Sequence, residues 1–161
     1  MTSESAAARQ SDAELYISRR FDAPRTLVFE TWTRPEHLNR WCCPTGFTIP
    51  FSEGEIRPGG TFRTCMRAPS GEEHWLSGTY REIVVPERIV FSHAWHDETG
   101  RPGHETVVTV RLQEDGEGTR LTLHQAFFAS EAARDGHEGG WNETLDSLAA
   151  YLAGLAGQSH A

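Results

Sequence analysis

The sequence has no long apolar run. No stretch approaches the ~20 consecutive apolar residues that a membrane-spanning helix needs, and the first twelve residues are polar and rich in alanine and serine. This composition does not resemble a signal peptide, whose central part is apolar. These absences argue against a membrane protein or an exported protein, and we expect a cytoplasmic location.

Basic residues are scarce, and so are cysteines. The chain carries 15 Lys and Arg residues against 23 Asp and Glu, for a net charge of -8. Nucleic acids and anionic membrane surfaces are bound by clustered cations, so we expect neither as a partner. The three cysteines, Cys42, Cys43 and Cys65, do not make a disulfide framework, and we interpret them as reduced thiols.

Common catalytic motifs are absent as well. The sequence contains no glycine-rich phosphate loop, no convincing Ser-His-Asp order and no paired carboxylates of suitable spacing. Its central histidines do not suggest a metal site, because His93 and His96 lie on opposite faces of a predicted strand. We therefore predict no catalytic residue, no metal and no cofactor.

The sequence does contain many short strands. Alternating polar and apolar residues between turns that carry Gly or Pro predict an antiparallel meander. On the last strand Leu123, Gln125 and Phe127 are expected to face inward and His124 to face solvent. The predicted strands cover residues 14–21, 47–56, 61–67, 74–85, 88–95, 104–113 and 119–128.

Helical segments flank this series of strands. Helical spacing after the first strand predicts a short helix near Leu27, and Pro35 begins a second one. A long helix is predicted over about residues 130–155, where an apolar stripe recurs at steps of four, three and four. Three glycines disturb its first half, so we expect a regular helix only from near Gly139.

The order of these elements predicts the fold. A sheet with one apolar face has to cover that face, and only the last helix is long enough to cross seven strands. We therefore predict an α+β helix-grip fold, in which a curved antiparallel sheet surrounds the C-terminal helix and leaves space for a ligand. The single domain is expected over residues 13–157, with a disordered tail at 1–12 and a short tail at 158–161.

Several short motifs resemble a known family. Together they span about residues 14–155 and are similar to the SRPBCC (START-like, birch-allergen-like) superfamily, in particular its activator of Hsp-90 ATPase homologue branch. The resemblance implies the helix-grip fold and an apolar cavity but fixes no function, because the superfamily includes lipid carriers, hormone-binding proteins and polyketide cyclases. The motifs are RFDAP at 20–24, PEHL at 35–38, GTYREI at 78–83, PERIVF at 86–91 and GW at 140–141.

Aromatic residues recur on the expected cavity wall. An aromatic wall with a few polar groups suits a flat apolar ligand. His93 shares a strand face with two aromatic residues, and Gln125 requires a partner if it is buried, either on the ligand or on the backbone. The predicted ligand-binding residues are Trp32, Trp41, Phe62, Tyr80, Phe91, His93, Trp95, Gln125, Trp141, Leu145 and Leu148.

Three functions fit such a domain. The aromatic wall and the missing catalytic motifs favour binding of a small hydrophobic or aromatic molecule. A cavity enzyme of the polyketide cyclase or dehydratase type is the second, with His93 and either Tyr80 or Gln125 as acid and base. The resemblance alone suggests the third, a co-chaperone that activates a chaperone ATPase. A homodimer formed through an exposed sheet edge is also compatible with the sequence.

Overall fold

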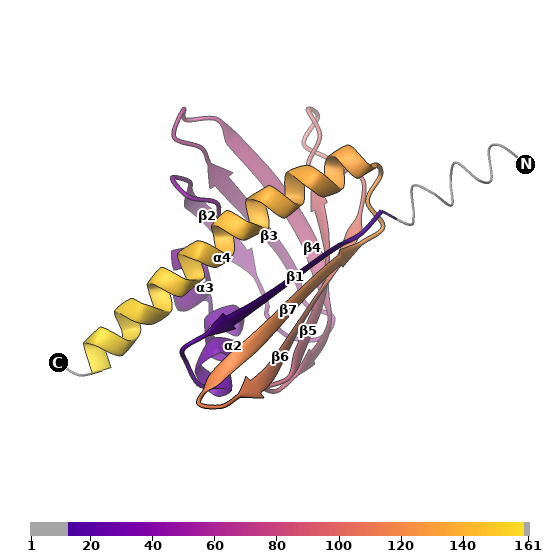
Figure 1. Cartoon of the computed structure of the whole chain (residues 1–161). Coiled ribbons are helices and arrows are strands. Elements are labelled where there is room, and N and C mark those ends of the chain that lie inside the picture. The colour runs from indigo at the N-terminus through magenta and orange to yellow at the C-terminus, as the bar shows by residue number, and fades with distance from the viewer. Residues whose placement is uncertain (1–12, 160–161) are drawn as a thin grey trace, which may run out of the picture.

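A curved antiparallel sheet surrounds one side of a long helix in the computed structural model, which describes residues 13–159 (Figure 1). The strands are β1 (Leu15–Phe21), β2 (Thr48–Gly54), β3 (Thr61–Arg67), β4 (Glu73–Val84), β5 (Arg88–Trp95), β6 (Thr106–Asp115) and β7 (Gly118–Ala126). The helices are α2 (Arg25–Thr33), α3 (Pro35–Trp41) and α4 (Glu131–Ser159). The strands lie in the order β1-β7-β6-β5-β4-β3-β2, so β1 and β2 form the two edges. The predicted helix-grip fold is confirmed.

The predicted tails fall mostly outside the part that the structure describes. Residues 1–12 lie outside it, as do residues 160 and 161. Residues 158 and 159, which the sequence placed in a tail, belong to α4. None of the described helices is both long and apolar enough to cross a membrane.

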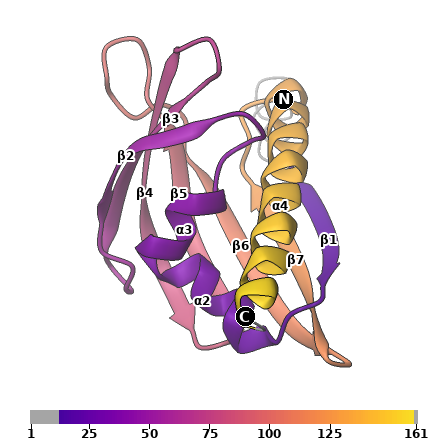
Figure 2. The same ribbon diagram turned by 90° about the vertical axis from the view of Figure 1, so that its left-hand side faces the viewer.

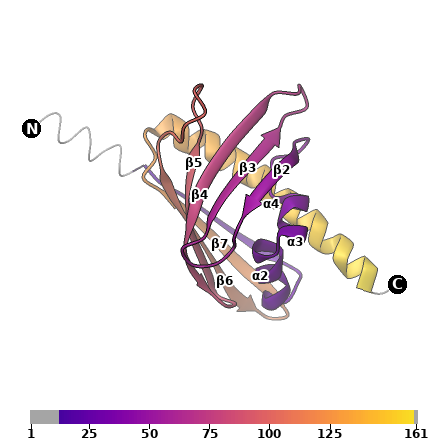
Figure 3. The same cartoon turned by 180° about the vertical axis from the view of Figure 1, so that it is seen from behind.

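The two short helices close one end of the curved sheet (Figure 2). Arg34 between them has extended backbone angles, and Pro35 occupies the first turn of α3, where its missing N–H costs little. The indole nitrogen of Trp41 donates a 2.9 Å hydrogen bond to the carbonyl of Thr31, which joins the two helices. Both α2 and α3 lie on the concave side, and within residues 13–159 no helix covers the other face of the sheet (Figure 3).

The first half of α4 is helical, contrary to the expectation that regular helix begins near Gly139. The Ser130 hydroxyl accepts a hydrogen bond from the N–H of Ala133 and so caps the first turn. Packing adds to this cap, because the ring of His137 lies 5.0 Å from that of the buried Phe128. A cap and a packed ring offset the helix-breaking tendency of the three glycines.

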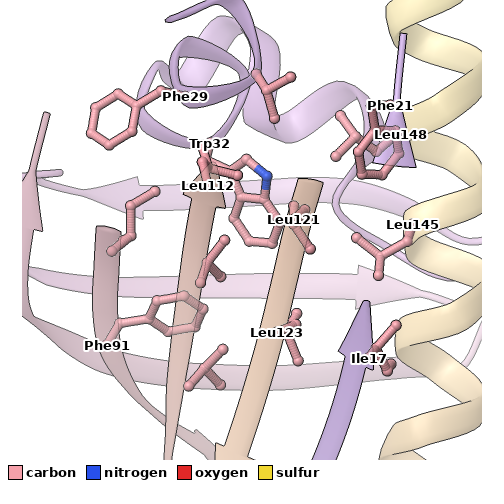
Figure 4. Close-up of a cluster of buried hydrophobic side chains, with 14 of the residues drawn as sticks. Ile17, Phe21, Phe29, Trp32, Phe91, Leu112, Leu121, Leu123, Leu145 and Leu148 are labelled. Carbon is pink, nitrogen blue, oxygen red and sulfur yellow. The ribbon is translucent and has the colours of Figure 1, made fainter. Parts of the chain in front are cut away.

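The second half of α4 packs directly on the sheet. Leu145 and Leu148 have no exposed surface and face Leu121 and Leu123 across the core (Figure 4). At the edge of this contact, Arg19 of β1 forms an ion pair with Asp146 and donates to the carbonyl of Asn142. The leucine stripe predicted from the sequence is therefore the part of α4 that forms the core.

The end of β7 departs from the predicted alternation. Phe127 was expected to face inward, but it is 52% exposed while Phe128 is buried. The cause is the backbone, because Phe127 has a φ of 71°. This left-handed conformation, uncommon for a residue with a side chain, ends the strand and directs the following side chain under α4.

Gly78 of β4 lies very close to Ser92 of β5 and Phe62 of β3. A substitution at Gly78 therefore tests how much this close packing contributes to stability. A Cβ added at Gly78 would overlap the carbonyl oxygen of Ser92 and lie 2.6 Å from the Phe62 ring. We predict that Gly78→Ala lowers the free energy of unfolding by about 2–3 kcal/mol, as overpacking does elsewhere. The control is Gly136→Ala in α4, where no atom lies within 4 Å of the new Cβ and stability should rise by about 1 kcal/mol. Urea unfolding measures both, and equal effects would contradict the prediction.

Candidate ligand-binding pocket

A pocket of about 500 Å³ lies between the concave face of the sheet and the first half of α4. This volume is within the range of sites that hold small molecules, ~300–1,000 Å³. Alternate residues of four neighbouring strands form its floor, because alternate side chains of a strand share one face. The floor residues are Ile49, Phe62, Thr64, Met66, His74, Leu76, Tyr80, Ile89, Phe91, His93 and Trp95.

The opposite wall comes from α4. The pocket remains open on this side because four of the wall residues are glycine or alanine. Glycine and alanine leave the helix surface bare, so the gap between helix and sheet is not filled by side chains. The α4 wall consists of Ala132, Ala133, Gly136, His137, Gly140, Trp141 and Thr144. Residues in and near the short helices close the side, namely Trp32, Leu38, Asn39, Cys42, Pro44 and Phe47.

Aromatic rings make up two parts of the wall. Phe62, Tyr80 and Phe91 form a cluster whose ring centroids lie 5.3–5.9 Å apart, within the spacing of favourable aromatic pairs. Trp32 stacks on Trp141 with centroids 6.1 Å apart. The first group belongs to the sheet and the second connects α2 with α4, so a ligand would meet aromatic surface from both sides.

Buried hydrogen bonds connect α4 to the sheet beside the pocket. The indole N–H of Trp141 donates to Gln125 Oε1 at 2.8 Å, and Gln125 Nε2 donates to Thr106 Oγ1 at 2.7 Å. The Thr106 hydroxyl in turn donates to the carbonyl of His93 at 3.1 Å. Gln125 thus finds partners in two protein side chains, rather than in the ligand or backbone group that the sequence suggested.

The hydrogen bonds of His137 define its tautomer. Its Nε2 accepts a 3.0 Å bond from the indole N–H of Trp95, which can only donate. Its Nδ1 lies 2.7 Å from the carbonyl of Ala133, which can only accept. Both contacts are satisfied by the tautomer with the proton on Nδ1, and together they join α4 to the end of β5.

Burial changes the acidity of His93. The residue is 8% exposed, and its ring lies against those of Trp95 and His137. The pKa of His93 is lowered to about 3, mainly by burial and to a smaller extent by the neighbouring His137. His93 is therefore uncharged at neutral pH and is not a base of the strength that an acid–base mechanism near pH 7 requires.

Two other groups in the wall are also held in their uncharged forms. Burial raises the pKa of the Cys42 thiol to about 12, with a smaller contribution from Cys43. Burial raises the pKa of the Tyr80 hydroxyl as well, and Cys42 adds to this shift. The thiol and the phenol therefore both keep their protons at neutral pH.

The structure brings together seven of the eleven predicted site residues. Trp32, Phe62, Tyr80, Phe91, His93, Trp95 and Trp141 line the pocket. The remaining four do not line it: Leu145 and Leu148 lie in the core below it, Trp41 packs edge-on behind Trp32, and Gln125 belongs to the hydrogen-bonded chain. The leucines were misplaced because the pocket lies over the earlier turns of α4.

Sequence reasoning identified Trp141 in the helical wall but missed the other residues of that wall. Gly136 and Gly140 are one turn apart, as are His137 and Trp141, so both pairs lie along one side of α4. The glycines were interpreted as breaks in the helix. Their spacing of four residues was the signal that could have identified a bare helix surface. In residues 13–159 no group of three or more His, Cys, Asp or Glu side chains is placed to hold a metal ion.

The curved sheet, the gripped helix and the pocket between them define the class: this is a helix-grip protein of the SRPBCC type. A profile of the family described as "Activator of Hsp90 ATPase homolog 1-like protein" matches residues 22–153, and the chain belongs to that family. The resemblance noted in the sequence is thereby confirmed. A search of curated proteins finds no match.

Solved structures from several bacteria have the same fold. The AHSA1 protein from Silicibacter pomeroyi is 27% identical with a TM-score of 0.81, over 88% of this chain and 98% of that one. A protein from Arthrobacter aurescens, solved by NMR, is 26% identical with a TM-score of 0.79, over 89% and 88%. A protein from Nitrosomonas europaea is 27% identical with a TM-score of 0.76, over 90% and 97%.

The role of Gln125 can be tested with a double-mutant cycle. Gln125→Leu removes the acceptor of the part-buried indole N–H of Trp141, and we predict a loss of about 2 kcal/mol in unfolding free energy. In a Trp141→Phe background that donor is absent, so the same change should cost roughly 1 kcal/mol less. Urea unfolding of the four proteins measures the coupling. Additive effects would show that the hydrogen bond contributes nothing to stability.

The low pKa of His93 predicts a dependence of stability on pH. Below the ordinary value of 6.5, the unfolded chain takes up a proton that the folded chain excludes until about pH 3. The contribution of His93 to the free energy of unfolding is therefore at its full value above pH 6.5, and it decreases as the pH falls. Between pH 7 and pH 5, the wild-type protein should lose about 2 kcal/mol more than His93→Phe. Unfolding curves that shift in parallel would contradict this prediction.

Proposed function

We propose that this protein binds a small, largely apolar aromatic molecule in the pocket between the sheet and α4. The observation that carries the proposal is the composition of the wall: none of its residues is Asp, Glu, Lys or Arg, although the chain has 15 basic and 23 acidic residues. Water in such a space has few hydrogen-bonding partners, and an apolar ligand replaces it with favourable contacts.

The aromatic rings of the wall favour a flat ligand rather than a flexible lipid chain. Rings on the sheet side and on the helix side offer planar surfaces, and burial of apolar area stabilises a complex by ~25 cal/mol per Å². A planar molecule contacts such surfaces with little loss of conformational freedom, whereas a flexible chain has to be ordered on binding.

An enzyme of the cyclase or dehydratase type is less well supported. Within the acid–base pair expected from the sequence, His93 is a weak base because its pKa is lowered to about 3, and the side-chain amide of Gln125 is occupied by Thr106 and Trp141. Activation of a chaperone ATPase rests on the family description alone.

The first test fills the pocket from the helix side. Gly136 lines the pocket and an added Cβ there meets no atom within 4 Å, so Gly136→Leu projects a side chain into the ligand space without a clash. We predict that this variant binds the neutral fluorescent probe N-phenyl-1-naphthylamine at least ~10-fold more weakly than the wild type, a difference of about 1.4 kcal/mol. Fluorescence titration measures the affinity.

The matched control is Gly139→Leu on the same helix. Gly139 is exposed, does not line the pocket, and has an equally empty surrounding, so this variant should bind the probe like the wild type. Equal affinities for Gly136→Leu and Gly139→Leu would place the bound probe elsewhere, and absence of binding by the wild type would count against a ligand-binding function for this pocket.

A further inference from the structure

Two buried polar side chains in the pocket wall, Tyr80 and His93, have no hydrogen-bond partner on another residue. Tyr80 is 6% exposed and His93 is 8% exposed. The Tyr80 hydroxyl makes no hydrogen bond within residues 13–159, and the His93 ring makes one only with its own backbone, which leaves its second ring nitrogen unpaired there. Buried polar groups in proteins are normally paired, because leaving one unpaired is destabilising. Two such groups on one pocket wall therefore require an explanation.

These groups open onto the pocket. Of the buried side-chain nitrogen and oxygen atoms in the described residues, the indole nitrogen of Trp32 is the one that is both fully enclosed and unpaired. The free atoms of Tyr80 and His93 are therefore not sealed inside the protein, and both residues line the pocket. A bound molecule can reach them, whereas it cannot reach the Trp32 nitrogen without a rotation of that ring.

The sheet places the two groups near each other. Tyr80 on β4 pairs with Phe91 on β5, and His93 lies two residues further along β5 on the same face. Diagonal neighbours of this kind have Cβ atoms ~7–8 Å apart. One small molecule lying on the floor of the pocket therefore extends far enough to contact both side chains.

The surrounding groups determine what charge the ligand can carry. The titratable side chains that line the pocket are Cys42, His74, Tyr80, His93 and His137. Both ring nitrogens of His137 are occupied by hydrogen bonds to Trp95 and Ala133, while burial holds Cys42, Tyr80 and His93 uncharged. His74 lies on β4, and its ring packs against that of Trp95 on β5. Its side chain is 41% exposed and lies near Glu72. A charged group in the ligand would thus find no fixed partner of opposite charge within the wall.

We infer that the pocket selects an uncharged, planar aromatic molecule that bears a hydroxyl group, and that Tyr80 and His93 form the hydrogen bonds that recognise it. The inference rests on the proposed function and specifies its ligand class. A hydroxyl both donates and accepts, so it suits a neutral imidazole nitrogen and a phenolic O–H equally. A ligand of matching shape without a hydroxyl would leave both protein groups unpaired and would be discriminated against for that reason.

The experiment compares 2-naphthol with 2-methylnaphthalene and 2-naphthoate. The three share a ring system and differ in carrying a hydroxyl, a methyl or a carboxylate group. Displacement of N-phenyl-1-naphthylamine at pH 7 gives the affinity of each for the wild type, Tyr80→Phe and His93→Phe. The ratio of 2-naphthol affinity to 2-methylnaphthalene affinity should fall about 5- to 10-fold in each variant, which corresponds to one net hydrogen bond. Comparing ratios cancels the different hydrophobicity of the two compounds.

Tyr151→Phe is the matched control, because Tyr151 lies outside the pocket and its hydroxyl is 2.5 Å from His37 Nδ1. It should leave the affinity ratio unchanged and reduce stability. Tyr80→Phe should change the ratio and leave the stability of the unliganded protein unaffected or raised, because the hydroxyl it removes has no partner in the protein. This contrast separates a ligand-recognition role from a structural one.

The outcomes distinguish the two proposals. Binding of 2-methylnaphthalene with an affinity ratio that is the same in all variants would overturn the inference and leave the apolar pocket in place. Tightest binding of 2-naphthoate by the wild type would also overturn it, because the ligand class would then be anionic. Failure of all three compounds and of the probe to bind would overturn the proposed function and the inference together.

Discussion

The buried chain of hydrogen bonds from Trp141 through Gln125 and Thr106 to the backbone of His93 holds α4 at a fixed distance from the sheet. It crosses from the helix over β7 and β6 to β5, and the two bonds that involve Thr106 are buried, where water competes little. On one side of this chain the helix packs directly on the strands. On the other side it stands away from them, and the pocket lies in the gap.

The composition of α4 changes at the same point. After Trp141 the inward positions hold Leu145, Leu148 and Leu152, which are buried to 5% exposure or less. Before Trp141 the positions that line the pocket are mostly glycine and alanine, and His137 is the one large side chain there that reaches the sheet. Side chains that line a pocket make fewer dispersion contacts than side chains in a packed core. The pocket therefore lowers the stability of the free protein. A ligand that binds only the folded protein restores stability by mass action.

The sequence predicted the fold well because the relevant signals are local and repeated. Alternation located the strands, and the leucine stripe located the helix that covers them. Two features were not predictable in this way. Phe127 faces outward because of a single left-handed backbone angle, which reverses the alternation after Ala126. The partners of Gln125 come from β6 and α4, and no local pattern indicates contacts between residues so far apart in the chain.

The pKa shifts of the pocket residues share one physical cause, which is burial, and burial acts on a bound ligand in the same way. Burial raises the pKa of Cys42 and Tyr80, which are acids, and lowers that of His93, which is a base. In each case the uncharged form is favoured, as expected where charge is poorly solvated. The same environment penalises a carboxylate or an ammonium group of a bound molecule, and no charged side chain in the wall compensates for it. We therefore propose that the pocket excludes charged molecules because it solvates charge poorly, and that Tyr80 and His93 discriminate among neutral molecules.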